Sequence, residues 1–179
     1  GRAGGGRIVA AGVRVLVPEA GTAIDELEAY ADPVFPVAWW RMGDGQPGVA
    51  QGATAFSLKE LADGFPGPID VVFGNNDGDR FLLCSIAAKH AHVTLHDPLA
   101  ELEVGGRKIL LTHYPEIGRR LAKSGEADAV FSGHDHQRYQ HRYGGGLWAN
   151  PGEIMGRFGV VSFGLYDPAA HAFEHVLVP

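Results

Sequence analysis

Two histidines one residue apart follow an apolar run in the segment FSGHDHQRYQ, where Gly133 comes directly before His134, Asp135 and His136. Imidazole is the commonest metal ligand among side chains. The two rings are too close in sequence to act as a helical i, i+4 pair, but in a tightly turned loop they could reach two neighbouring ions. Two ions about 3.5–4 Å apart would clamp a phosphate, polarise it and generate a hydroxide nucleophile. The segment therefore predicts metal chemistry on a phosphate.

Two further loops offer compatible ligands. Asn75 lies in GNNDGD, just after the apolar segment 69–73, and His113 lies in LLTHYP, just after the apolar segment 107–111. Imidazole nitrogens and an amide oxygen suit borderline divalent metals such as Mn²⁺, Fe²⁺, Zn²⁺ or Ni²⁺. We therefore predict that Asn75, His113, His134 and His136 are metal ligands.

Each of these residues also has a simpler interpretation. GNND is rich in turn-forming residues, so Asn75 could only shape a turn. His113 could be a satisfied strand-end histidine, and His134 and His136 could be ordinary loop residues. Metal ligation is favoured because the four residues occur in loops of the same kind. The remaining histidines are interpreted as surface or strand polar residues: His90, His92, His96, His141, His171 and His175.

The elements that must position these loops are strands alternating with helices. The sequence predicts strands at 13–17 and 69–73 and helices at 22–31 and 56–64. It then predicts a hairpin with strands 99–104 and 107–111 around a Gly105–Gly106 turn. A helix in EIGRRLAKSG is expected to end at Gly125, and a strand in ADAVF to precede the histidine pair. The last third is rich in β-structure, with turns at 144–146 and 167–170.

This order of elements predicts an α/β fold. In βαβ units the functional groups gather at the carboxyl ends of strands, so the loops at 74–77, 112–115 and 132–137 can converge although they are far apart in sequence. The sheet-rich tail indicates a second, mixed or antiparallel sheet. The predicted architecture is a four-layer α-β-β-α sandwich of two mixed sheets flanked by helices, formed by residues 1–179 as a single domain.

The composition narrows the class of protein. A chain of 179 residues with 45% hydrophobic content suits one domain with a sizeable core. The net charge of −6, without a Lys/Arg cluster, argues against a polybasic membrane patch and against nucleic acid except as a nucleotide-type substrate. No run approaches the ~18 apolar residues of a membrane span. The single cysteine, Cys84, excludes an internal disulfide framework and is compatible with a reducing cytosol, so a cytoplasmic location is expected.

Four motifs, GNNDGD, LLTHYP, SGHDHQ and NPGEIMGRFG, resemble in order and spacing those of the calcineurin-like metallophosphoesterases. The resemblance is to the small bacterial and archaeal branch of Mn- or Ni-using phosphodiesterases, and it runs from Phe56 to the C-terminus. It implies that Asn75, His113 and His134 bind one ion and that His136 binds the second. It also implies that Asn76 lies near the leaving group, where an amide can hydrogen-bond phosphate but cannot act as a general acid at neutral pH.

The first third departs from this family. Its members carry Asp-x-His after the first strand, whereas this chain has PEA at 18–20, and all nine histidines lie at His90 or later. The next family ligand is an aspartate that bridges the two metals. Asp44 in RMGDGQPG is the candidate for it, and Glu19 is a weaker one. The segment 33–54 has two adjacent tryptophans and no clear strand periodicity. It is either a divergent loop or the result of a local reading-frame error in the underlying sequence.

The resemblance implies a metal-dependent phosphoesterase that acts on a small-molecule phosphodiester or phosphomonoester through metal-bound hydroxide. Manganese is the expected metal, with nickel, iron or zinc as alternatives, and one or two ions are expected. A homo-oligomer is compatible with the sequence. An alternative function is supported by the absence of the Asp-x-His motif. It is a catalytically weakened member of the superfamily used as a scaffold or protein-binding module, as the retromer subunit of this superfold is.

Overall fold

The computed structural model describes residues 58–59, 61–64, 67–153 and 160–178, together with the backbone of two strands, β1 (Ile8–Ala11) and β2 (Phe35–Ala38). Residues 58–59 and 61–64 are helical, which agrees with the helix predicted at 56–64. The strand predicted at 13–17 and the helix predicted at 22–31 lie outside the described residues. Two candidate carboxylates, Glu19 and Asp44, also lie outside them.

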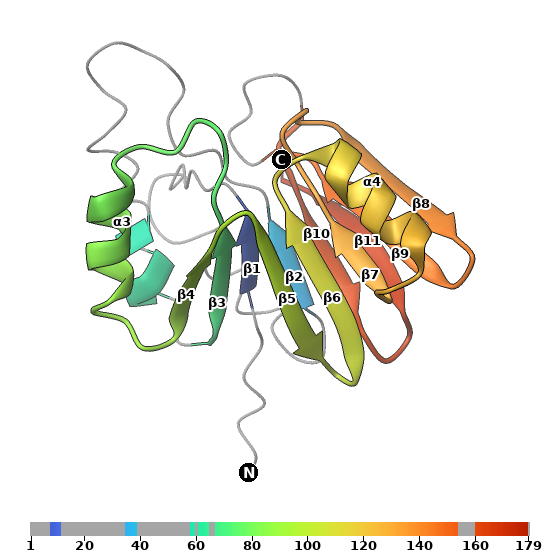
Figure 1. The fold of residues 1–179 in the computed structure, drawn as a ribbon, viewed down its shortest axis with the longest axis horizontal. Coiled ribbons are helices and arrows are strands. Elements are labelled where there is room, and N and C mark those ends of the chain that lie inside the picture. The colour runs from blue at the N-terminus through green and yellow to red at the C-terminus, as the bar shows by residue number, and fades with distance from the viewer. Residues whose placement is uncertain are drawn as a thin grey trace.

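Six strands form the first sheet, in the order β11-β10-β2-β1-β3-β4 (Figure 1). β3 (Ile69–Val72) pairs in parallel with β1 on one side and with β4 (Val93–His96) on the other, and β1 also pairs in parallel with β2. β10 (Ser162–Asp167) and β11 (Ala172–Leu177) form an antiparallel hairpin that joins the sheet at β2. Every residue of β3 is buried, as expected for a central strand covered on both faces.

Five strands form the second sheet, in the order β5-β6-β7-β9-β8. The three central strands are parallel: β6 (Arg107–Thr112), β7 (Ala129–Phe131) and β9 (Gly146–Pro151). The two edge strands, β5 (Leu99–Val104) and β8 (Arg138–Tyr143), pair antiparallel with their neighbours. The predicted hairpin between β5 and β6 is confirmed. Gly105 and Gly106 have φ of 58° and 76°, the left-handed backbone that glycine adopts most readily.

The β-rich tail divides between the two sheets. The prediction that the tail forms a second sheet holds for β8 and β9, whereas β10 and β11 return to the first sheet. There β10 pairs with β2, with Gly164 opposite Val37. Alternation of apolar and polar residues predicts a strand and its faces, but it carries no information on which distant strand will be the neighbour.

Besides the helical residues at 58–59 and 61–64, two helices are described over their whole length, and they flank the sheets. α3 (Arg80–Ala87) begins after Asp79, whose side chain accepts a 3.1 Å hydrogen bond from the Leu82 amide. α4 (Pro115–Ser124) has proline in its first turn and ends at Gly125, which has φ of 75°. The predicted end at Gly125 is therefore confirmed. Among the described residues, no helix combines the length and the apolar character that crossing a membrane would need.

Alternate residues along the strands of the second sheet face two core layers. Ile109 and Leu111 of β6 pack in the layer between the two sheets. Leu110, between them in sequence, packs on the opposite face with Val130 and Trp148, in the cluster that also contains residues of α4. Because side chains alternate with a period of two along a strand, one face of this sheet contacts the first sheet and the other contacts α4.

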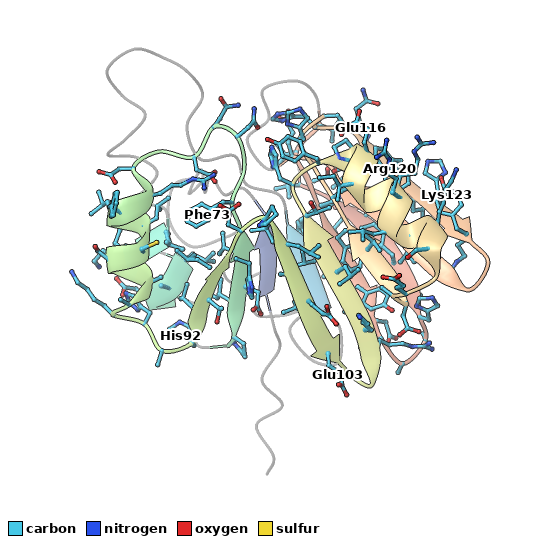
Figure 2. The ribbon with its side chains drawn as sticks, viewed as in Figure 1. Phe73, His92, Glu103, Glu116, Arg120 and Lys123 are labelled. Atoms are coloured by element: carbon cyan, nitrogen blue, oxygen red, sulfur yellow. The ribbon has the colours of Figure 1, made fainter. Side chains whose placement is uncertain are left out.

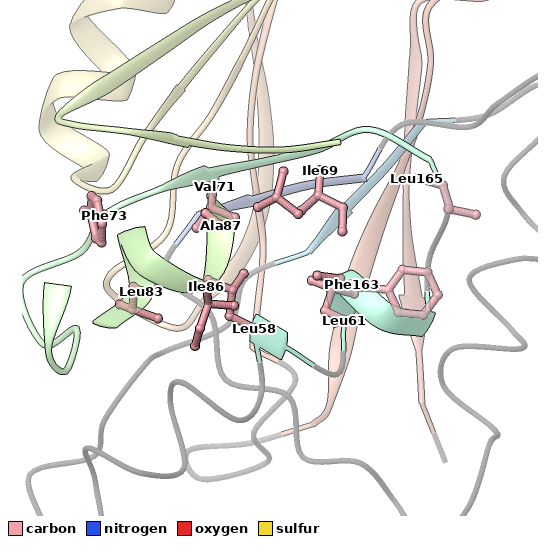
Figure 3. Packing of buried hydrophobic residues seen from close by; sticks show 12 residues of the cluster. Leu58, Leu61, Ile69, Val71, Phe73, Leu83, Ile86, Ala87, Phe163 and Leu165 are labelled. Carbon is pink, nitrogen blue, oxygen red and sulfur yellow. The ribbon is translucent and has the colours of Figure 1, made fainter. Parts of the chain in front are cut away.

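The layer between the first sheet and α3 is built in the same way (Figure 3). Ile69 and Val71 of β3 point into it with Leu83 of α3, while Val72 points into the layer between the sheets. Leu58, from the helical segment, is fully buried in the same layer. Each such side chain contributes about 1.5–3 kcal/mol when buried. The layers run α3, first sheet, second sheet, α4, which confirms the predicted four-layer sandwich.

Candidate metal centre

Three loops that leave the carboxyl ends of strands meet at one edge of the sandwich. The loop 74–77 follows β3 of the first sheet, while His113 follows β6 and the loop 132–137 follows β7 of the second sheet. Glu116, in the first turn of α4, lies near this edge in Figure 2, and Glu103 lies at the opposite edge. Both sheets therefore contribute to one site across the core layer that separates them.

Asn75, His113 and His134 come into direct contact, and we call them the convergent triad. The Nε2 atom of His113 lies 2.7 Å from the Oδ1 atom of Asn75 and 3.0 Å from the Nδ1 atom of His134. The third side of the triangle, from His134 Nδ1 to Asn75 Oδ1, is 3.2 Å. His113 is buried, whereas Asn75 and His134 are exposed. The triad is thus anchored on its inner side and open to solvent on its outer side.

The spacing within the triad fits a divalent metal ion. Ligand atoms at right angles around an ion with bonds of about 2.1 Å lie about 3.0 Å apart, close to the three distances observed here. Both rings can present a lone pair to the common point when they carry their N–H on the other nitrogen, and the amide oxygen is always an acceptor. This donor set suits a borderline metal.

The triad differs in composition from a cluster of acidic residues and histidines. Among the described residues, no group of three or more His, Cys, Asp and Glu side chains is arranged to hold an ion. The convergent triad falls outside that description because its third member is an amide.

The loop that carries His134 and His136 has an unusual backbone. Both residues adopt left-handed conformations, with φ of 73° and 62°. For a non-glycine residue this costs of order 1–3 kcal/mol, and such strain clusters at functional sites. Asp135 holds the loop from within. One of its carboxylate oxygens accepts hydrogen bonds from the Asn150 side chain at 2.6 Å and from the Gln137 amide at 3.1 Å. Asn150 therefore shapes the loop from behind.

The glycine of the GNNDGD motif makes room for His113. A β-carbon built on Gly74 would lie 2.8 Å from the Cε1 atom and 2.9 Å from the Nδ1 atom of that imidazole. These distances are shorter than real β-carbon contacts, so any larger residue would displace the ring. The strand end at Gly74 thus sets the position of a candidate ligand from another sheet.

The loop after β3 is held by two charged groups. Asp77 accepts a hydrogen bond from the Gly74 amide, and the Arg80 guanidinium donates a 3.2 Å bond to the Gly74 carbonyl. Arg80 also pairs with Asp97 at 2.7 Å and lies 4.6 Å from the centre of the Phe73 ring. Burial raises the pKa of Asp77 to about 6, while the bond from Gly74 and the Arg80 charge lower it. These contacts fix the backbone that presents Asn75.

His136 has a different environment from the triad. Its Nδ1 atom lies 2.7 Å from the Oε2 atom of Glu153, a side chain that is only 5% exposed. His136 is a ligand predicted from the sequence, whereas Glu153 is not. The available signal was its position: a carboxylate directly after the Asn-Pro-Gly turn of the NPGEIMGRFG motif.

Tyr114 is a second residue that the sequence did not point to. Its ring lies 4.9 Å from the His113 ring and 5.2 Å from the His134 ring, measured between centroids. It occupies the N-cap of α4 but makes no capping hydrogen bond through its side chain, although small polar residues are preferred there. The Tyr114 side chain is exposed and contacts both imidazole rings of the triad.

The remaining predicted residues lie as follows. Asn76 is exposed in the same turn as Asn75, next to the convergent triad in sequence. Four of the histidines interpreted as structural hydrogen-bond residues that are distant in sequence: His92 with the Ala62 carbonyl, His96 with Asp70 at 2.9 Å, His171 with the Gly145 carbonyl and His175 with the Asn150 carbonyl.

Comparison with known proteins identifies the family. A model of the calcineurin-like phosphoesterase superfamily domain matches residues 22–169 of the chain. Phosphodiesterase MJ0936 of Methanocaldococcus jannaschii is 27% identical over 126 residues, which cover 69% of this chain and 75% of that protein.

Solved structures share the fold. A structure of an archaeal phosphodiesterase matches with a TM-score of 0.74 at 23% identity, covering 96% of this chain and 99% of that one. Vps29 of Entamoeba histolytica, in complex with zinc, matches with a TM-score of 0.54 at 16% identity, covering 96% and 97%. Vps29 of Chaetomium thermophilum matches with a TM-score of 0.56 at 13% identity, covering 96% and 91%.

Proposed function

The chain belongs to the calcineurin-like phosphoesterase superfamily, and from this premise we propose that it hydrolyses phosphate esters with a divalent metal. The observation that carries the proposal is the convergent triad, whose three ligand-type atoms lie 2.7–3.2 Å apart. The 27% identical relative is named as a phosphodiesterase, which supports a small phosphodiester as the first substrate class to test, with phosphomonoesters second.

In this proposal Asn75, His113 and His134 hold one ion, and His136 serves a second. When bound, the metal supplies Lewis acidity toward the phosphate and a hydroxide nucleophile near neutral pH. Manganese is the proposed metal, with nickel, iron or zinc as alternatives. Asp44 is the proposed bridging carboxylate.

Asn76, in the loop after β3, limits how the leaving group can be protonated. Asn76 is exposed beside the triad and can donate hydrogen bonds to a phosphoryl oxygen. An amide holds no proton that it can release at neutral pH, so Asn76 does not protonate the leaving group. The leaving group therefore takes its proton from water, which favours esters with acidic leaving groups such as aryl alcohols.

The experiment starts from the full 179-residue chain, stripped of metal with a chelator and reloaded with Mn²⁺. We expect hydrolysis of bis-p-nitrophenyl phosphate that appears with Mn²⁺ and disappears on chelation, with p-nitrophenyl phosphate as the monoester comparison. Elemental analysis of the reloaded protein should give close to one ion per chain, because His136 has fewer named partner ligands than the triad. Two ions of equal affinity would contradict that count.

A second candidate function is a scaffold that binds other proteins and has lost catalysis. The specific observation in its favour is the sequence PEA at 18–20, where the family resemblance leads one to expect Asp-x-His. The likeness in fold to Vps29 is compatible with it but shows the fold alone. Absence of hydrolysis with Mn²⁺, Ni²⁺, Fe²⁺ and Zn²⁺ in turn would contradict the enzyme and favour the scaffold.

We also propose that residues 1–179 form a single domain. A single cooperative melting transition, seen at the same temperature by near-UV and far-UV circular dichroism, is the expected result. Two separated transitions would contradict it.

A further inference from the structure

Glu153 is the only side chain in the NPGEIMGRFG motif, among its described residues, that makes a hydrogen bond to one of the candidate ligands. Its Oε2 atom lies 2.7 Å from His136 Nδ1. The Glu153 side chain is 5% exposed and that of His136 is 17% exposed. A buried carboxylate is costly unless it is hydrogen-bonded or paired, so a contact of this kind is a strong constraint on both side chains.

The backbone presents Glu153 in a fixed position. Gly152 has φ of 91°, and its amide donates a 3.0 Å hydrogen bond to the Asn150 side chain. The Glu153 carbonyl accepts a 2.8 Å bond from the Ser162 amide, within a β-bridge to Val161. The carboxylate therefore extends from a segment that is tied to both neighbouring strands, β9 and β10.

His136 needs such a partner because its own loop fixes only part of its geometry. Its left-handed backbone, with φ of 62°, sets the position of the α-carbon, whereas the orientation and tautomer of the ring depend on side-chain contacts. A carboxylate that accepts the Nδ1–H selects one ring orientation and one tautomer, and it leaves the Nε2 lone pair for a metal.

We propose that Glu153 is a positioning residue that holds the His136 ring with its proton on Nδ1, so that Nε2 is the ligand atom. The proposal rests on the proposed function in one respect, the identification of His136 as a ligand of the second ion. The triad ligand His134 turns its Nδ1 atom to the site instead, so the two histidines of SGHDHQ use different ring nitrogens. The tautomer of each ring can therefore be measured to test the proposal without measuring catalysis.

The first measurement is the tautomer of His136 in the full, metal-free chain, labelled with ¹⁵N in histidine. Two-bond ¹⁵N–¹H correlation spectra distinguish Nδ1–H from Nε2–H rings, and His136→Ala assigns the His136 signals by their loss. We expect an Nδ1–H ring in the parent and in Glu153→Gln, whose amide oxygen still accepts the bond. Glu153→Ala should give a mixture in which the Nε2–H form is substantial.

The second measurement is Mn²⁺ affinity, followed by electron paramagnetic resonance of the free ion. Loss of a hydrogen-bonded partner behind a ligating histidine weakens metal binding about 10–100-fold. Glu153→Ala should weaken the second ion by that factor and leave the first ion on the triad unchanged. Glu153→Gln should fall between the parent and Glu153→Ala. Glu103→Gln, an exposed carboxylate at the opposite edge of the sandwich (Figure 2), is the matched control and should behave as the parent.

The outcomes separate this proposal from the proposed function. An unchanged tautomer in Glu153→Ala would overturn the positioning role, whatever the activity. An equal loss of both ions, with a lowered melting temperature in Glu153→Gln as well, would also overturn it, because it would make Glu153 a general structural residue. If the parent binds no Mn²⁺ at all, the proposed function fails, while the tautomer measurement still decides whether Glu153 sets the His136 ring.

Discussion

The two ends of the second sheet use polar residues in opposite ways. At the hairpin end, donors meet acceptors: Arg107 donates to an oxygen of Asp128 at 2.9 Å, and the Lys108 amide donates to the other oxygen at 2.9 Å. At the carboxyl end, two ring nitrogens of this sheet's loops and an amide oxygen from the loop after β3 of the first sheet face one another within 3.2 Å.

This contrast separates residues that stabilise the fold from residues that we propose bind a metal. The groups at the hairpin end satisfy one another within the protein, so they need nothing further. The groups at the carboxyl end could be satisfied together by a positive ion at their common centre, and one of the residues that present them, His134, has a left-handed backbone. Local rules of folding are most often broken where function requires it.

The largest expected effect is loss of activity at the carboxyl end. His134→Ala should abolish Mn²⁺-dependent hydrolysis of an aryl phosphodiester, because it removes one of the three ligands proposed for the first ion, whereas only one described ligand, His136, is proposed for the second. His136→Ala should retain measurable turnover if one ion suffices. Initial rates at saturating metal measure both. The melting temperature should barely change, because His134 is an exposed loop residue.

A further variant at the same position separates ligation from strain. His134→Gly should lose the same activity but gain about 1 kcal/mol of stability, because glycine adopts the left-handed backbone at φ of 73° without a penalty. Equal and total loss of turnover in His134→Ala and His136→Ala would mean that both ions are required. The first third of the chain would then supply ligands that the sequence did not reveal.

Metal should stabilise the carboxyl end by mass action. At a free Mn²⁺ concentration 100 times the dissociation constant, the expected gain is about 2.7 kcal/mol, or roughly 5–10 °C in the melting temperature of a chain of this size. Differential scanning calorimetry of the stripped protein with and without Mn²⁺ measures it. The rise should vanish in His134→Ala. A rise of the same size in that variant would place the ion elsewhere.

Two glycine substitutions compare the ends directly. Gly74→Ala puts a methyl group 2.8 Å from the His113 ring, so it should cost about 1–3 kcal/mol and shift a ligand, with a marked fall in activity. Gly106→Ala meets no atom within 4 Å and strains only a left-handed turn at the hairpin end. It should cost about 1 kcal/mol and leave kcat unchanged. Urea denaturation measures the loss of stability in each variant, and initial rates measure kcat. Equal effects on kcat would contradict the claim that only the carboxyl end contributes to activity.

The smallest effect is a change in the pH dependence of stability at the hairpin end. The hydrogen bonds from the Lys108 amide and Arg107 lower the pKa of Asp128 below its usual 3.8. A carboxyl with a lowered folded-state pKa stabilises the protein above its unfolded pKa and loses that contribution as the pH falls through the folded value. Asp128→Asn should therefore melt below the parent at pH 7, by an amount that shrinks under pH 4. Glu174→Gln, exposed on β11, is the control, and its melting temperature relative to the parent should not change with pH in this way.

Much of the architecture follows from local patterns. The strand at β3, the hairpin turn at Gly105–Gly106 and the end of α4 at Gly125 are predicted because apolar runs and glycines fix them within a few residues. The convergent triad is predicted for a similar reason. Each of its members directly follows an apolar strand, and strands in such folds bring their carboxyl ends to one edge.

The features that the sequence did not predict depend on contacts between distant segments. α3 was not recognised because Phe81 is 89% exposed, so apolar residues surround that helix and mark no single face. The contact of Glu153 with His136 exists only because β10 ties the end of β9 in place. Asp44 lies outside the described residues, so its role as bridging ligand stays a prediction.

The pairing of β10 with β2 has a consequence for how the protein is made. The whole of the second sheet lies between these two strands in the chain, so the ribosome must synthesise β5 to β9 before β2 can meet its partner. Contacts of such long sequence separation form slowly. In the meantime the exposed edge of β2 is a template for strands of other nascent chains. Deleting the last hairpin, 162–177, should leave that edge open permanently, so that the chain aggregates instead of folding.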